Sequence, residues 1–268
     1  MPVINQSRPF DYDRLTGHLF EDVLDILGST GVILPLADKH HGALTDTQTT
    51  IGNEQLDFTM SAALSSFATP PKYNGAVPSV QFNGTSENGE SPDNTFWTRS
   101  LLAGSWGAWI NLVDDASLDI ILAKYDATSG AEAREWRFYQ DTSDRLVIEL
   151  WDETANAAIG RRQAAALSHL TWIFVVATYD GGAPSSSLKL YVNGVQVDDT
   201  DQNTGVFTTM QNTATVVTIG SEQGTAAVEG FLNGQIAGGA LGPIYTQKEL
   251  SLDEIKRLYN IGRRALGV

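Results

Sequence analysis

The sequence predicts an all-β domain that has a short helix near each end. Three observations support this class. Short apolar segments alternate with polar turns, and the chain of 268 residues contains 25 glycines but only 9 prolines. An Asn-Gly pair at 193–194 joins two of these segments, and this pair is typical of a two-residue β-hairpin. Helical spacing of apolar residues occurs only before residue 28 and after residue 251.

The first 30 residues are predicted to form an N-terminal arm with a short helix. Apolar residues recur there at helical spacing up to Gly28, which is a plausible helix stop. Such a stripe covers its own domain in a monomer, or docks on a neighbouring chain in an assembly. We expect the second case, with anchoring over residues 14–27. The expected partner-binding residues are Leu15, Leu19, Phe20, Val23, Ile26 and Leu27.

Residues 31–248 carry the strand pattern. The longest run, 170–179, is too apolar for a solvent-facing edge, so we expect it in the centre of a sheet. The other strands are expected near residues 32–36, 55–60, 80–82, 105–112, 118–125, 134–140, 145–151, 188–192, 215–219 and 231–236, with a further strand from residue 196.

A closing helix is predicted over residues 251–265. Ser251 and Glu254 have the spacing of a capping box, in which each side chain accepts a hydrogen bond from the other residue's backbone N–H. Ile255, Leu258 and Tyr259 then lie on one face. The arginines near the C-terminal end of this segment complement the helix dipole.

The charge balance excludes several classes of protein. Lys and Arg number 17 and Asp and Glu number 32, which gives a net charge of −15. A surface this acidic disfavours nucleic acid and anionic membranes as partners. The absence of cysteine excludes disulfides and thiol chemistry. No apolar run is long enough to span a membrane, and residues 1–10 show no secretory signal, so we expect no membrane insertion and synthesis in a cytoplasm.

Seven segments resemble, in order, the motifs of laminin-G-like domains of the concanavalin A-like lectin/glucanase superfamily. The resemblance covers residues 31–265 and implies a jelly-roll sandwich of two antiparallel sheets over 31–268, closed by the helix at 251–265. The segments are 80–85 (Val-Gln-Phe-Asn-Gly-Thr), 107–111 (Gly-Ala-Trp-Ile-Asn), 172–180 (Trp-Ile-Phe-Val-Val-Ala-Thr-Tyr-Asp), 188–194 (Leu-Lys-Leu-Tyr-Val-Asn-Gly), 218–220 (Thr-Ile-Gly), 231–236 (Phe-Leu-Asn-Gly-Gln-Ile) and 250–259 (Leu-Ser-Leu-Asp-Glu-Ile-Lys-Arg-Leu-Tyr).

The segment 236–247 and the residues after Leu258 depart from the common family form. They resemble a variant found in structural proteins of tailed bacteriophages. This resemblance implies a protein on the exterior of a virion, made in the host cytoplasm. Its expected partners are other virion proteins, such as the major capsid or tail protein, and further copies of itself.

The sequence lacks the paired carboxylates of a retaining glycosidase, which on one strand face would read Glu-x-Asp-x-Glu. The nearest pair, Glu149 and Asp152, would face opposite sides of an ideal strand, so we interpret it as a strand end and turn. The four histidines do not have metal-binding spacing. We therefore expect no catalytic residues.

Two kinds of ligand are considered. Calcium is common in this family, but the usual acidic positions after the first motif are here Asn83, Ser86 and Glu87, so Asn83 and Glu87 are weak calcium candidates and no cofactor is expected. Carbohydrate would need exposed aromatic side chains beside polar groups. The candidates are Trp97, Trp136 and Trp151, although Trp97 also suits an anchor that packs a loop.

Two functions follow as expectations. The first is a non-enzymatic virion protein, either a capsid decoration (cement) protein or a tail or fibre adhesin. The alternative is a carbohydrate-binding module that recognises a host surface.

Overall fold

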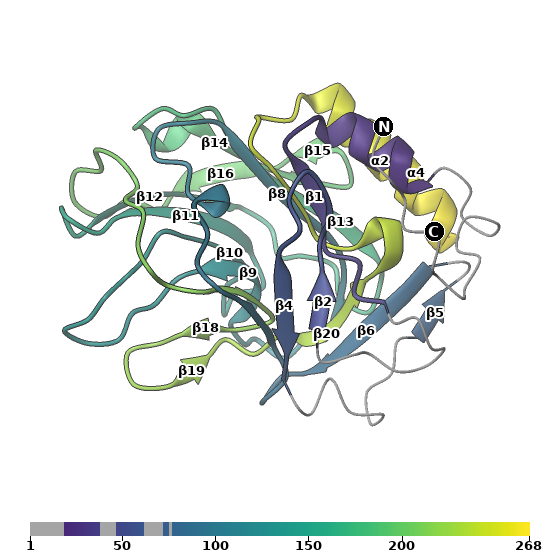
Figure 1. Ribbon diagram of the computed structural model, residues 1–268, viewed down its shortest axis with the longest axis horizontal. Helices are drawn as coiled ribbons and strands as arrows, with labels where there is room; N and C mark the ends of the chain where they lie inside the picture. The colour runs from purple at the N-terminus through teal and green to yellow at the C-terminus, as the bar shows by residue number, and fades with distance from the viewer. Residues whose placement is uncertain (1–18, 38–46, 62–71, 75–76) are drawn as a thin grey trace.

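The structure is a computed structural model that describes residues 19–37, 47–61, 72–74 and 77–268; of residues 72–74 it describes only the backbone. Two large antiparallel sheets lie face to face in the described part of the chain (Figure 1). The predicted sandwich over residues 31–248 is therefore confirmed. Among the described residues, no helix is both long and apolar enough to cross a membrane.

The first sheet, sheet A, is ordered β15-β14-β13-β8-β20-β6-β5, and β1, β21 and β3 extend it beside β8. Every pairing between its strands is antiparallel. The bounds are β1 Gly31–Ile33, β3 Ile51–Gly52, β5 Lys72–Asn74, β6 Val77–Asn83, β8 Gly104–Leu112, β13 Ile173–Tyr179, β14 Leu188–Val192, β15 Val195–Gln196, β20 Asn233–Ala237 and β21 Ile244–Thr246.

The second sheet, sheet B, is ordered β16-β12-β11-β10-β9-β17-β7-β4-β2. A small hairpin, β18 (Glu222–Gln223) with β19 (Val228–Glu229), follows β17 and lies at the lower left of Figure 1. The bounds in sheet B are β2 Thr47–Thr49, β4 Asp57–Met60, β7 Gly89–Ser91, β9 Asp119–Lys124, β10 Trp136–Gln140, β11 Leu146–Asp152, β12 Ala157–Gln163, β16 Asp198–Asp201 and β17 Val217–Ile219.

The main core fills the space between the two sheets. Alternate residues of a strand point to the same face, so each sheet contributes every second side chain. Trp106 on β8 and Trp136 on β10 meet there with ring centroids 5.5 Å apart, and Tyr245 on β21 contacts both rings. These aromatic side chains join the sheets at their centre.

Strand β13 is buried along its whole length, as predicted for the run at 170–179, although the strand begins only at Ile173 and Leu170 is exposed. It lies between β8 and β14. Val175 and Ala177 face the main core, whereas Phe174 and Val176 face the opposite side of sheet A. That side needs a cover of its own, and two helices supply it.

The first of these helices is the C-terminal α4 (Leu252–Leu266), and its predicted capping box is present. The Ser251 hydroxyl accepts from the Glu254 N–H, and a carboxylate oxygen of Glu254 accepts from the Ser251 N–H at 2.9 Å. The helix ends at Gly267, whose φ of 75° is left-handed. Ile255 and Leu258 are buried against sheet A.

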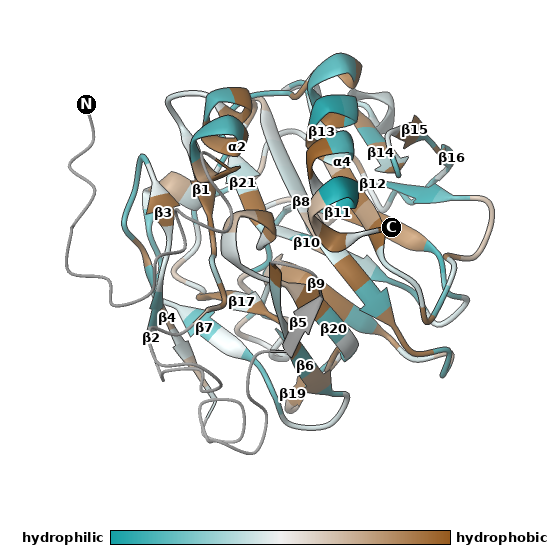
Figure 2. Cartoon of the chain, turned by 90° about the vertical axis from the view of Figure 1, so that its right-hand side faces the viewer, coloured by the Kyte–Doolittle hydropathy of each residue, from teal (hydrophilic) through white to brown (hydrophobic). Residues whose placement is uncertain are grey.

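The second is α2 (Leu19–Leu27), which lies beside α4 on the outer face of sheet A (Figures 1 and 2). Val23, Ile26 and Leu27 are at most 2% exposed, in a cluster with Ile33, Trp109 and Phe174 of sheet A and residues of α4. Phe20 is partly buried on the same cluster. The expectation that these side chains serve a partner chain is therefore wrong, because the chain's own sheet already covers them.

Leu19 begins the helix and is partly exposed, and Leu15 lies outside the described residues. The helix itself was predicted correctly from its spacing. The Asn193-Gly194 hairpin is also confirmed. Its two φ angles are 52° and 78°, the positive values that a type I′ turn requires.

Candidate functional site

The candidate site lies on the outer face of sheet B. Helices α2 and α4 cover the outer face of sheet A, as Figures 1 and 2 show. No helix of the described residues packs on the outer face of sheet B. Instead, the β18–β19 hairpin lies beside β9, where the Ile120 N–H donates to the Gly230 carbonyl and the Ala127 N–H donates to the Gln223 carbonyl.

This face carries charged and aromatic side chains because of strand alternation. On β10, Trp136 and Phe138 point into the core, so Arg137 and Tyr139 point outward. On β11, Ile148 and Leu150 point into the core, so the residues between and beside them point outward. The outward residues of these strands are Arg137, Tyr139, Val147, Glu149 and Trp151.

Arg137 is the centre of this face. Its Nε donates to Glu149 at 2.8 Å and its Nη1 donates to Glu222 of β18 at 2.7 Å. The guanidinium lies between the rings of Tyr125 and Tyr139, 4.6 Å from each centroid. One cation thus fixes two carboxylates and two aromatic rings, which ties the β18–β19 hairpin to the sheet.

The electrostatics of this cluster follow from burial. Burial raises the pKa of Glu222 to about 7, although the neighbouring Arg137 opposes this shift. Burial also raises the pKa of Tyr125 and of Tyr139, whose hydroxyls stay protonated. For Arg137 burial acts the other way, but the carboxylates of Glu149 and Glu222 outweigh it and raise its pKa. The guanidinium therefore stays charged.

Trp151 is the predicted aromatic candidate that lies on this face. It is partly exposed, and the ring of Tyr125 meets it edge-on at 6.1 Å. The Arg134 guanidinium lies 4.0 Å from its ring centroid. Two hydrogen bonds of 2.8 Å to Glu153 and one of 2.7 Å to Asn156 hold Arg134 in place. The guanidinium thus covers one face of the indole, and Glu153 and Asn156 hold it there.

The other two tryptophan candidates are not surface residues. Trp97 is 3% exposed and Trp136 is fully buried, and both belong to the main core. Trp97 contacts Phe58, Phe96 and Tyr245 through its ring. The expectation of sugar platforms at these two positions is wrong. The packing role considered for Trp97 is what the structure shows, because the helical turn η1 (Thr95–Trp97) turns the indole inward.

A cavity of about 270 Å³ adjoins the Arg137 cluster. It lies between β7, β17 and the β18–β19 hairpin. Carboxylates and hydroxyls predominate among the polar side chains that line it, and none of the lining side chains is cationic. The lining residues are Glu90, Asp126, Ala214, Thr215, Val216, Thr218, Ser221, Glu222, Gln223 and Val228.

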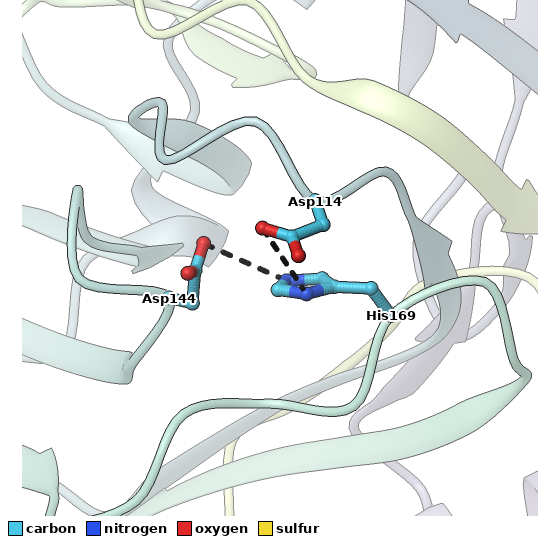
Figure 3. Close-up of side chains that lie close together, drawn as sticks. All are labelled: Asp114, Asp144 and His169. Carbon is cyan, nitrogen blue, oxygen red and sulfur yellow. Dashed lines mark ion pairs between the residues drawn. The ribbon is translucent and has the colours of Figure 1, made fainter.

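A second polar cluster lies where the loops after β8, β10 and β12 meet (Figure 3). His169 lies with its Nε2 3.6 Å from Asp144 and its Nδ1 3.9 Å from Asp114. These three side chains are close enough together to share a metal ion. Among the described residues, no other group of three acidic or histidine side chains lies this close together. His169 Nε2 also contacts Gln140 Oε1 at 3.1 Å.

Behind this cluster lies the buried carboxyl of Asp119. Burial raises the pKa of Asp119 to about 6, against a hydrogen bond of 2.7 Å from the Asn233 N–H that lowers it. Gln140 Nε2 donates to both Asp119 and Asp144 at 3.2 Å. Both Nε2 hydrogens of Gln140 are thus donated to carboxylates, so its Oε1 faces His169 and accepts a hydrogen bond from the Nε2–H of the imidazole.

The calcium candidates Asn83 and Glu87 do not belong to that cluster. Asn83 Oδ1 accepts hydrogen bonds from the N–H groups of Thr85 and Ser86, so it closes a turn at the end of β6. Glu87 is buried. A calcium site at these positions stays a prediction.

The carboxylates of β11 have structural roles. Glu149 is bonded to Arg137. Burial disfavours the charged form of Asp152, but hydrogen bonds from the N–H groups of Ala155, Thr209 and Thr208 outweigh burial and lower its pKa. Asp152 therefore fixes a turn, as the sequence indicated.

The comparisons with known proteins agree with this architecture. The model of the concanavalin A-like lectin/glucanases superfamily matches residues 83–255, which is more than half of the chain. No curated protein matches the chain.

Two solved structures share the fold. The binding domain of botulinum neurotoxin serotype D has a TM-score of 0.57 at 14% identity, with 89% of this chain and 52% of that chain covered. Trypanosoma rangeli sialidase has a TM-score of 0.54 at 12% identity, with 88% of this chain and 33% of that chain covered. The chain thus spans about half the length of the first structure and a third of the second. At such identities the likeness establishes the fold alone.

Proposed function

The chain belongs to the concanavalin A-like lectin/glucanases superfamily, and from this membership we propose that it is a non-catalytic module that binds carbohydrate on the outer face of sheet B. One of the solved structures of the same fold is a toxin binding domain by its name. For the present chain, binding is what we propose.

The observation that carries the proposal is Trp151 in its polar frame. A sugar ring has an apolar face of C–H groups and a rim of hydroxyls. The partly exposed indole offers an apolar surface, while Arg134, Glu153 and Asn156 offer donors and acceptors beside it.

The state of the carboxylates supports a binding role without catalysis. A retaining glycosidase needs one free nucleophile and one acid about 5 Å apart. On this face Glu149 and Glu222 are both bonded to Arg137. Asp152, at the buried end of β11, accepts from three backbone N–H groups. We therefore expect no hydrolysis of β-glucans by the purified protein.

The proposal is tested by screening the protein on a glycan array and titrating the best glycans by calorimetry. Trp151→Ala should weaken binding at least tenfold, because it removes the apolar surface. Val195→Ala is the matched control, since Val195 is an exposed apolar residue on sheet A, and it should bind like the wild type. Urea denaturation of both variants checks that they fold. Absence of glycan binding, or unchanged binding by Trp151→Ala, contradicts the proposal.

We further propose a setting on the exterior of a tailed-phage particle, as capsid decoration or as a tail or fibre adhesin. The supporting observations are the C-terminal resemblance and the net charge of −15, which suits an outer surface rather than contact with packaged DNA. With α2 buried on its own sheet, the particle contact would have to use another surface. Mass spectrometry of purified particles tests this setting, and absence of the protein from them contradicts it.

A further inference from the structure

A chain of side-chain contacts links the proposed binding face to the cavity beside the Arg137 cluster. Trp151 contacts Tyr125, the Tyr125 ring contacts Arg137, and Arg137 bonds to Glu222, which lines the cavity. The cavity and Trp151 are therefore neighbours of the same Arg137 cluster. The volume of about 270 Å³ is near the lower end of small-molecule sites, so it suits one ring-sized residue.

The cavity is rich in hydrogen-bond acceptors and has no cation of its own. Glu90, Asp126 and Glu222 supply three carboxylates. Its hydroxyls are partly occupied: Thr218 donates to the Ser221 carbonyl, and the Ser221 hydroxyl accepts from Asn88. A ligand that fits must therefore bring donors and positive charge.

Glu222 is the group that most needs such a ligand. It is 1% exposed, and while its Oε1 accepts from Arg137, its Oε2 has no hydrogen-bond partner in the described part of the chain. A buried carboxylate oxygen without a donor is unfavourable. The single positive charge of Arg137 is shared with Glu149, so it does not balance Glu222 alone.

A metal ion does not satisfy this arrangement. A hard cation such as Ca²⁺ needs several oxygen ligands, each about 2.3–2.6 Å from the ion. Among the described residues, the acidic and histidine groups close enough to share an ion are Asp114, Asp144 and His169, and none of them lines this cavity. The three carboxylates of the cavity are spread around a ring-sized space instead.

We infer that this cavity binds the ammonium group of an unacetylated amino sugar, with Glu222 as the buried anion and Glu90 and Asp126 at the wall. The inference rests on the proposed carbohydrate-binding function and names its substrate class. The pKa of Glu222, which burial raises to about 7, agrees with it, because an adjacent ammonium group would favour the charged carboxylate. Carboxylated sugars should be repelled from the cavity.

The test compares glucosamine oligomers, N-acetylglucosamine oligomers of the same length and calcium chloride in calorimetric titrations of the whole protein. The glucosamine oligomer should bind at least tenfold more tightly. Glu222→Gln should remove that preference. Because Glu222→Gln also alters the Arg137 cluster, Glu90→Gln is a second variant whose exposed side chain has no bond to Arg137. It should reduce the preference severalfold.

Glu229→Gln is the matched control. Glu229 lies opposite Glu222 in the hairpin, is exposed and does not line the cavity, so the preference should survive in this variant. Equal binding of both oligomers, preference that survives Glu222→Gln and Glu90→Gln, or calcium binding that depends on Glu222 would overturn the inference. If neutral glycans bind in a Trp151-dependent way without an amine preference, the inference fails and the proposed function stands. If no glycan binds, both fail.

Discussion

Replacing Ile26 by alanine measures how far α2 belongs to the domain that it covers. Ile26 is 1% exposed and lies in the cluster between α2, α4 and the outer face of sheet A. Truncating a buried isoleucine to alanine costs about 2–5 kcal/mol, from lost burial and from the cavity that remains. The upper part of this range applies because the strands on one side of the cluster are held by their neighbours in sheet A and do not shift to fill the space. We therefore expect a loss of about 3–5 kcal/mol in the free energy of unfolding.

The measurement is urea denaturation followed by tryptophan fluorescence, at constant m-value. Asp25→Ala is the matched control. Asp25 lies in the same turn of α2 but is exposed, and replacing it removes an acidic group from the C-terminal half of the helix. That change should leave the protein as stable or slightly more stable. If Ile26→Ala alters the free energy of unfolding by less than about 0.5 kcal/mol, α2 is not part of the core and the reasoning from burial is refuted.

Three further predictions concern other parts of the molecule. Gly262→Ala should destabilise the protein by about 1–3 kcal/mol, because a Cβ there would collide with the Trp109 indole. This cost outweighs the gain of about 1 kcal/mol in helix propensity. A higher urea midpoint for the variant would contradict this prediction. Arg137→Met should cost about 3–5 kcal/mol, because Glu149 and Glu222 lose their shared cation, and adding Glu222→Gln should restore part of the loss in the same assay. Asp119 has a folded-state pKa raised to about 6 from 3.8, so the native state binds more protons between these values. The free energy of unfolding of the wild type, relative to that of Asp119→Asn, should thus be highest below pH 4 and fall as pH rises through 6. Urea denaturation of both proteins at pH 4, 5, 6 and 7 measures this difference. A difference that stays constant over these pH values would show that the predicted sign is wrong.

The sequence predicted the fold well where local pattern and tertiary environment agree. The run that became β13, the Asn-Gly hairpin and the capping box of α4 each have a local physical cause that the sandwich does not override. Strand β12 was missed because Ala157–Gln163 has neither alternation nor a continuous apolar run. The short strands β7 and β21 depend on neighbours distant in sequence, which no local pattern reports.

The role of α2 and the site were harder for one common reason. Periodicity shows that one face of a helix is apolar, but it does not show which chain covers that face. In the same way, tryptophan identity does not show which side of a sheet the ring lies on. Strand phase would have separated Trp136 from Trp151, because the first is in register with core residues of β10 and the second with Glu149 of β11. Arg137 and Glu222 are 85 residues apart, so their pairing could not be read from the sequence.

The position of β20 governs how the molecule can fold. This late strand lies between β8 and β6 and pairs with both, so it joins the two halves of sheet A. Until residues 233–237 have been synthesised, the facing edges of β6 and β8 have open backbone groups, which are the surfaces through which nascent chains aggregate. Contacts of this sequence separation also slow folding. Sheet A therefore cannot close progressively on the ribosome; it has to wait for β20, and chains that end before β20 should collect as aggregates.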